Sequence, residues 1–254
     1  MSKKFIVDIA RCSGCYNCQL ACKDEHTTNS WPPYALCQPL TGHFWCRVED
    51  HVHGTIPKVK IHYEAQLCRH CDDAACMNAC PSGAIYRREA EGFVLIDPEK
   101  CTGCKACVSA CPFGMVYFNS EKNIAQKCTG CAHLLDAGLG QPRCVEACPT
   151  DALQMVDDEP EDGLRAVYRN RPGRFIGGLL YDPIEKEVVI GAKVTLSNGQ
   201  EAVTDDFGDF WFHDLAEGVY DLTVEAEGFQ ARRFEAVSTV GQDVNLGDIP
   251  LKRT

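Results

Sequence analysis

The pattern of apolar and polar positions changes along the chain. The N-terminal sequence MSKKFIVDIARC predicts a β-strand that leads directly into a cysteine-rich segment. Two later apolar stretches, GFVLIDPEKC (92–101) and KNIAQKC (122–128), predict short strands that return to further cysteine-rich segments. After residue 172 short alternating strands with Gly and Asp turns take over, as in GAKVTLSNG and GVYDLTVEAEGF. The pattern predicts an α+β first part and an all-β second part.

One sequence motif occurs three times within the first part. ACPSGAIY (79–86), ACPFGMVYF (110–118) and ACPTDALQM (147–155) each turn from a predicted short helix into a short strand. Repetition of such a unit is typical of ferredoxin-like folds. The sequence therefore predicts two ferredoxin-like modules in the first part of the chain.

All eighteen cysteines lie in the first 148 of the 254 residues, and sixteen of them form four runs. The runs are Cys12, Cys15, Cys18 and Cys22; Cys68, Cys71, Cys76 and Cys80; Cys101, Cys104, Cys107 and Cys111; and Cys128, Cys131, Cys144 and Cys148. The last two cysteines of every run stand four positions apart, which is about one helical turn. We therefore expect both sulfurs on one face of a short helix, at different heights.

The spacing within the runs favours iron–sulfur chemistry. A Cys-x-x-Cys-x-x-Cys loop can place three thiolates on three corners of a [4Fe–4S] cube, and Gly14, Gly103 and Gly130 help the backbone to approach it. The fourth sulfur can serve a neighbouring cluster, and the proline that follows it in three runs turns the chain away. Cysteines so close in sequence rarely suit disulfide geometry. Four zinc sites are the alternative, although zinc knuckles come as separated pairs.

Other polar residues give weaker signals. Cys37 and Cys46 belong to no run, and we interpret them as small buried apolar residues. Positive charge beside a cluster raises its reduction potential, and Lys23 stands where the other three runs carry proline. The basic residues close to the runs are Arg11, Lys23, Arg69, Lys100, Lys105, Lys127 and Arg143. The histidines show no ligand spacing with carboxylates or with each other, so we assign them no chemistry.

Charge and composition exclude several function classes. Residues 1–172 contain 18 basic and 21 acidic residues, and residues 173–254 contain 7 and 15. The acidic charge of this second part argues against nucleic acid or an anionic membrane surface as a partner. No stretch approaches the roughly 18 apolar residues of a membrane span, so we expect no transmembrane segment. The sequence contains no P-loop and no G-x-G-x-x-G motif, and we expect no substrate chemistry on this chain.

The four runs in this order, with the wide gap between Cys131 and Cys144 and the stretch KCTGCAHLL (127–135), resemble a known family. It is that of the iron–sulfur electron-transfer subunits of the dimethyl sulfoxide reductase family of molybdopterin oxidoreductases. The resemblance covers about residues 1–156 and implies four [4Fe–4S] clusters whose ligands cross between runs. The implied ligand sets are set 1 (Cys12, Cys15, Cys18, Cys148), set 2 (Cys22, Cys128, Cys131, Cys144), set 3 (Cys68, Cys71, Cys76, Cys111) and set 4 (Cys80, Cys101, Cys104, Cys107).

The second part carries a further resemblance. VTDDFGDFWF (203–212) is similar to carboxypeptidase-regulatory or CnaB-like sandwiches, which are transthyretin-like in shape. With KDEH (23–26) and WPPY (31–34), it resembles the pyrogallol–phloroglucinol transhydroxylase and catechol dehydroxylase branch of the family. The expected domains are a double ferredoxin-like four-cluster domain (1–156, with an insertion at 23–67), a linker (157–172) and a β-sandwich (173–254).

The resemblance implies a non-catalytic electron-transfer subunit. Its partner would be a large catalytic subunit with molybdenum or tungsten on bis-molybdopterin guanine dinucleotide, in a heterodimer or a larger complex. The partner would remove or transfer a hydroxyl group of an aromatic substrate. Alternatives are the same module in a polysulfide, thiosulfate, sulfoxide or arsenate reductase, and a stand-alone polyferredoxin. We expect a cytoplasmic location, with export bound to a twin-arginine-bearing partner as the alternative.

The insertion 23–67 is irregular in pattern and rich in aromatic residues and prolines. These are Trp31, Pro32, Pro33, Tyr34, Phe44, Trp45 and Tyr63. Such a density suits an interface with a partner subunit. The alternative is that the same side chains shield the clusters from water.

Overall fold

The computed structural model describes residues 2–55 and 58–254 and contains two compact units. The cysteine unit comprises Met1–His51 and His62–Arg171. The sandwich unit comprises Val52–Ile61 and Pro172–Thr254. Within the described part of the chain, no helix combines the length and the apolar character needed to cross a bilayer.

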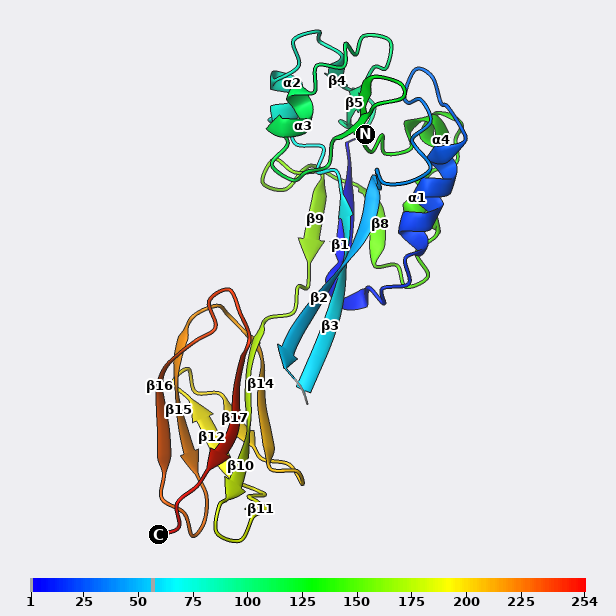
Figure 1. Ribbon diagram of the computed structural model, residues 1–254. Coiled ribbons are helices and arrows are strands. Elements are labelled where there is room, and N and C mark those ends of the chain that lie inside the picture. The colour runs from blue at the N-terminus through cyan, green and yellow to red at the C-terminus, as the bar shows by residue number, and fades with distance from the viewer. Residues whose placement is uncertain (1, 56–57) are drawn as a thin grey trace. The chain divides into compact units, whose positions relative to one another are not determined.

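A three-stranded sheet has the N-terminal strand β1 (Lys3–Asp8) in its middle (Figure 1). β8 (Leu153–Asp157) pairs with β1 antiparallel, and β9 (Ala166–Arg169) pairs with it parallel. Phe5 is fully buried in the core of the unit. The predicted N-terminal strand is therefore confirmed. β9, however, lies in the segment 157–172, which was expected to be a linker. This part of the segment is a strand because its backbone hydrogen-bonds to β1.

Two short hairpins follow cysteine runs. β4 (Ile85–Arg87) pairs with β5 (Val94–Ile96), and β6 (Tyr117–Asn119) pairs with β7 (Ile124–Gln126). All three residues of β5 and of β7 are buried. These hairpins confirm the predicted order of cysteine run, short strand and returning strand.

The helical elements of the cysteine unit are short, apart from one. They are η1 (Ile9–Arg11), α1 (Asn17–Thr27), α2 (Ala75–Asn78), α3 (Ala106–Ala110), α4 (Ala132–Asp136) and α5 (Arg143–Glu146). α2, α3 and α5 end before the fourth cysteine of their runs, so the expectation of two sulfurs on one helix is wrong there. The cause is the following Pro81, Pro112 or Pro149, because a residue before proline avoids helical backbone. Cys111 is indeed extended, with φ −75° and ψ 113°. Lys23 replaces the proline in the first run, and α1 continues for 11 residues.

A long hairpin occupies much of the insertion 23–67. β2 (Cys46–Thr55) and β3 (Lys58–Leu67) are 10 residues each and lie side by side (Figure 1). The expectation of an irregular insertion is therefore wrong over these residues. β3 carries apolar or aromatic residues at every second position from Val59 to Leu67, which is a strand pattern. The hairpin residues 52–61 group with the sandwich unit.

The sandwich unit contains two four-stranded sheets. One is formed by β10 (Arg174–Asp182), β11 (Glu187–Val188), β14 (Asp209–Leu215) and β17 (Val244–Pro250), and the other by β12 (Lys193–Leu196), β13 (Glu201–Val203), β15 (Val219–Glu225) and β16 (Arg232–Ser238). In β15, Tyr220, Leu222 and Val224 are buried and alternate with outward residues. Their side chains join those of β10 and β14 in one core. The predicted β-sandwich is confirmed.

We expect the fragment 172–254 to fold without the rest of the chain, because every buried residue of the sandwich core lies between Ile176 and Leu251. In this fragment Leu222→Ala, at a position that is 0% exposed, should lower the free energy of unfolding by about 2–5 kcal/mol. The control Val203→Ala, at a position 62% exposed, should change it by less than about 0.5 kcal/mol. Urea denaturation followed by circular dichroism measures both. A fragment without a cooperative transition would contradict the expectation.

Candidate iron–sulfur centres

All eighteen cysteines are free thiols and lie in the cysteine unit. Of the sixteen cysteines in the runs, seven are buried and seven are half-buried. The remaining two, Cys15 and Cys104, are exposed. Because no two thiols are joined as a disulfide, all of them are available as metal ligands.

Three cysteines of the fourth run lie around the last cysteine of the first. Burial, followed by the neighbouring thiols of Cys144, Cys131 and Cys128, raises the pKa of Cys22 well above its usual value. Burial likewise raises the pKa of Cys128 to about 12. The packing of α1 against α5 brings Cys22 to Cys144. The structure thus brings the four cysteines of set 2 together.

Set 3 surrounds a cavity. Cys68, Cys71 and Cys76 of the second run line it together with Cys111 of the third run. Burial, followed by the thiol of Cys68, raises the pKa of Cys71. The Sγ of Cys111 also accepts a hydrogen bond from a backbone N–H at 3.4 Å. Lys127 lines the same cavity.

Set 1 joins the beginning and the end of the cysteine unit. Burial is the main cause that raises the pKa of Cys12, and the thiols of Cys18, Cys148 and Cys15 contribute. The antiparallel pairing of β1 with β8 explains this proximity, because the first run follows β1 and Cys148 precedes β8.

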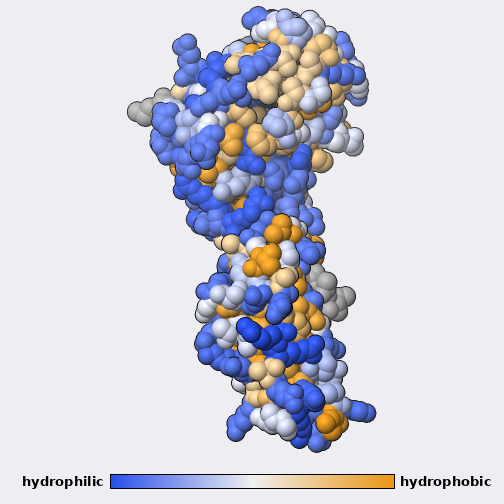
Figure 2. Space-filling model, turned by 90° about the vertical axis from the view of Figure 1, so that its left-hand side faces the viewer, coloured by the Kyte–Doolittle hydropathy of each residue, from blue (hydrophilic) through white to orange (hydrophobic). Residues whose placement is uncertain are grey.

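Set 4 lies near an apolar part of the surface. Burial raises the pKa of Cys107 to about 11, and the thiols of Cys101, Cys76 and Cys80 add to it. Figure 2 views the side of this unit on which Figure 1 shows α2 and α3, and apolar residues form a patch there. Cys104 is exposed, and its place in set 4 rests on the motif alone.

Backbone geometry allows close approach at the start of each run. Gly14, Gly103 and Gly130 stand between the first two cysteines of three runs, and all have positive φ angles. A Cβ at Gly130 would lie 2.3 Å from the ring of Phe93. In the second run His70 occupies this place with a φ of 42°, and its ring is buried.

The basic residues near the runs have different environments. Six of them bind carboxylates, carbonyl groups or aromatic rings: Arg11, Lys23, Arg69, Lys100, Lys105 and Arg143. Lys127 is 2% exposed, and its Nζ lies 3.3 Å from Cys68 Sγ. Among residues 2–55 and 58–254, no carboxylate is paired with it. A buried cation needs a counter-charge, which an iron–sulfur centre on thiolates would supply. The donor set and its surroundings therefore fit such a group.

Cys46 is a residue near the site that sequence reasoning missed. It is 1% exposed, and its thiol is hydrogen-bonded with those of Cys144 and Cys18. Its backbone N–H also donates to Cys22. The interpretation as a buried residue is thus correct but incomplete, because Cys46 lies between set 1 and set 2. Nothing in its sequence neighbourhood indicates this position.

The KDEH segment connects the first run to the fourth. Glu25 binds Arg143 at 2.8 Å and His133 at 3.0 Å. His26 is 1% exposed, and its Nε2 lies 3.8 Å from Cys131 Sγ. Burial lowers the pKa of His26 to about 3, so its imidazole is neutral near pH 7. These side chains hold α1 beside set 2.

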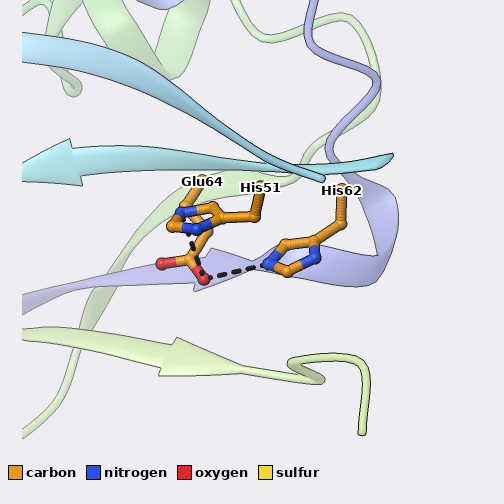
Figure 3. A group of neighbouring side chains, drawn as sticks. All are labelled: His51, His62 and Glu64. Atoms are coloured by element: carbon orange, nitrogen blue, oxygen red, sulfur yellow. Dashed lines mark hydrogen bonds and ion pairs between the residues drawn. The ribbon is translucent and has the colours of Figure 1, made fainter. Parts of the chain in front are cut away.

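One group of side chains outside the runs has the composition of a metal site. His51, His62 and Glu64 have ligand atoms within 4.8 Å of one another, and Figure 3 shows both imidazoles beside the carboxylate. No spacing in the sequence indicates this group. Arg171 already contacts both carboxylate oxygens of Glu64, at 2.7 and 2.9 Å, and Gln66 donates to one of them. The carboxylate is therefore neutralised, and we interpret the group as an ion-pair network around the buried Glu64.

Comparisons with known proteins agree with the chemistry of the runs. Residues 59–158 match the 4Fe-4S dicluster domain, and residues 176–252 match the carboxypeptidase regulatory-like domain. The small subunit of pyrogallol hydroxytransferase from Pelobacter acidigallici is 36% identical, over 97% of this chain and 98% of its own. A subunit of the anaerobic dimethyl sulfoxide reductase from Escherichia coli K12 is 38% identical, over 65% and 76%. The iron–sulfur subunit ArrB of arsenate respiratory reductase from Shewanella sp. ANA-3 is 32% identical, over 65% and 86%.

We expect Gly130→Ala to lower the iron content and the melting temperature of the protein. The new Cβ would meet the Phe93 ring at 2.3 Å, in addition to about 1–2 kcal/mol of backbone strain at positive φ. Gly138→Ala is the matched control, because its φ is also positive but nothing lies within 4 Å of its Cβ. Iron analysis and thermal melting of both variants measure the effect. Equal losses in the two variants would show that the Phe93 contact is unimportant.

Proposed function

Because the chain belongs to the iron–sulfur electron-transfer subunits of the molybdopterin oxidoreductases, we propose that it relays electrons through four [4Fe–4S] clusters. The electrons pass to or from a catalytic subunit that carries molybdenum or tungsten on bis-molybdopterin guanine dinucleotide. When bound, each cluster supplies one-electron redox chemistry. The observation that carries the proposal is that thiols from different runs lie together, as Cys22 does with those of the fourth run.

The proposed route follows the electrostatic influence of neighbouring sets on one another. Cys46 is hydrogen-bonded to Cys18 and Cys144 (sets 1 and 2), the thiol of Cys68 raises the pKa of Cys128 (sets 2 and 3), and that of Cys76 raises the pKa of Cys107 (sets 3 and 4). They support the order set 1, set 2, set 3, set 4. The two exposed cysteines, Cys15 and Cys104, then belong to the terminal sets. Electrons enter and leave the cysteine unit at these two ends.

Exposed apolar side chains support a partner subunit. The aromatic residues of the insertion lie partly inward: Trp45 is 1% exposed and packs on His26, with ring centres 4.7 Å apart. Trp45 therefore covers the cysteine core, as the second of the two interpretations expects, whereas Trp31, Tyr34, Phe44 and Tyr63 are half-buried. Leu20 and Leu40 are instead 60% and 78% exposed and flank a groove along α1. We propose that the catalytic subunit covers this groove.

The proposed substrate of the complex is a hydroxylated aromatic compound. The support is the relative named for pyrogallol hydroxyl transfer, whose alignment covers 97% of the chain and so includes the sandwich. The alignments with the sulfoxide and arsenate reductase subunits each cover 65% of the chain. The chemistry itself takes place on the partner, and this chain supplies or removes the electrons.

Affinity purification of the tagged chain from its native cells tests the proposed partnership. We expect a stable complex with a large molybdenum- or tungsten-containing subunit, and oxidation or reduction of the clusters when a polyhydroxylated benzene is added. Leu40→Asp should weaken the complex, whereas Val203→Asp, at an exposed sandwich position, should not. A fully loaded monomer without a large subunit would favour a stand-alone carrier. Turnover with a sulfoxide or arsenate instead would reject the aromatic substrate.

The crossing of ligands is tested by Cys22→Ser. The wild-type chain is expected to hold about sixteen irons, by four irons in each of four clusters. Cys22→Ser should lower this number and alter the electron paramagnetic resonance signal of the cluster on Cys128, Cys131 and Cys144. Cys37→Ser is the control, because Cys37 belongs to no set and should leave all signals intact. Damage confined to the cluster of Cys12, Cys15 and Cys18 would contradict crossing.

A further inference from the structure

The pentapeptide KCTGC occurs twice in the chain, at 100–104 and at 127–131. Its lysine precedes the first cysteine of a run in both places, but the two environments differ. The side chain of Lys100 is 66% exposed and pairs with Asp97 at 3.0 Å. Lys127 is 2% exposed and pairs with no carboxylate in the part of the chain that the structure describes. The local sequence is the same, so the difference comes from the tertiary fold.

The fold holds Lys127 between two cysteine sets. Its Nζ lies 3.3 Å from the Sγ of Cys68, which belongs to set 3. The same nitrogen donates to the backbone carbonyl of Val94 on β5 and, at 3.0 Å, to that of Cys128 in set 2. These acceptors fix the ammonium group at the boundary of the two sets. Burial raises the pKa of Cys76 and of Cys128, and the positive charge of Lys127 opposes this rise at both thiols.

No other described group competes for this charge. Apart from the thiols of the two sets, a buried titratable group that feels the charge of Lys127 is His70, whose Nδ1 accepts the N–H of Val94 at 3.0 Å. Burial, and secondly the charge of Lys127, keeps the pKa of His70 well below its usual value, so the imidazole is neutral. The acceptors of Lys127 are thus one thiol and two carbonyl groups. A charge in so dry a position acts strongly on any neighbouring change of charge.

We propose that Lys127 is a positioning residue that raises the reduction potentials of the clusters held by set 2 and set 3. The inference rests on the proposed function, because it requires clusters at these sets. Reduction of a cluster adds one electron and one negative charge to it, and no proton moves in this step. The nearby ammonium stabilises the reduced form more than the oxidised form. The effect is largest at set 3, whose Cys68 sulfur is in direct contact with the ammonium.

The consequence concerns the middle of the electron route. Sets 2 and 3 are the inner two of the four in the proposed order. A positive charge between them lowers the free energy of an electron on either cluster and so favours passage of an electron through the centre of the route. Lys100, although it has the same sequence neighbours, is screened by solvent and by Asp97 and does not have this effect.

Redox titration of the loaded complex, monitored by electron paramagnetic resonance, tests the proposal. The variants are Lys127→Met, Lys127→Gln, Lys127→Arg and, as the matched control, Lys100→Met. At the wild-type midpoint of the set 3 cluster, Lys127→Met and Lys127→Gln should lower the ratio of reduced to oxidised cluster at least tenfold, a shift of about 59 mV. Lys127→Arg keeps the charge and should change the ratio less than threefold. Lys100→Met should leave all midpoints unchanged.

Three results would overturn the proposal. They are unchanged midpoints in Lys127→Met with full iron content, a shift in Lys127→Met but none in Lys127→Gln, and an equal shift in Lys100→Met. If both neutral variants fail to load iron, Lys127→Arg decides: wild-type midpoints support a role of the charge, and a tenfold loss contradicts it. Absence of clusters from the wild-type chain would instead contradict the proposed function.

Discussion

The structure of the cysteine unit depends on one constraint: thiols from distant parts of the chain lie together. Cys12 lies with Cys148, and Cys22 lies with Cys128. The central position of β1 between β8 and β9, and the packing of α1 on α5, satisfy this constraint. Buried thiols with raised pKa values hold their protons until a metal replaces them, so metal binding and folding are coupled. The sandwich unit has its own apolar core and does not share this coupling.

Much of the fold follows from local sequence, and its exceptions have physical causes. The strands next to the runs and the strands of the sandwich can be predicted from the sequence, because burial of every second residue leaves a clear pattern of apolar positions. The ends of α2, α3 and α5 also follow from a local rule, the effect of Pro81, Pro112 and Pro149 on the preceding residue, which the helical expectation overlooked. β9 could not be predicted, because four residues in an acidic and basic stretch show no period. Only pairing with β1 makes them a strand.

The residues of the candidate site likewise include some that the sequence predicts and some that only the tertiary structure reveals. Spacing identifies the sixteen cysteines of the runs, because a metal centre requires ligands at fixed intervals. Spacing cannot distinguish Lys127 from Lys100, which share the pentapeptide KCTGC, nor can it place Cys46 between two sets. The meeting of His51 with His62 and Glu64 likewise depends on the β2–β3 hairpin. The roles of these residues depend on their burial and on their tertiary neighbours. The flanking sequence indicates neither the burial nor the neighbours.

The grouping of the hairpin tip, residues 52–61, with the sandwich unit has a consequence for evolution. A gene fusion that appended only residues 172–254 to a shorter ancestor would not have supplied the side chains of the tip. His53 contacts Asp243 at 2.5 Å, and Lys60 contacts His213 at 3.1 Å. The sandwich unit in its present form therefore draws its side chains from two separate segments of the gene.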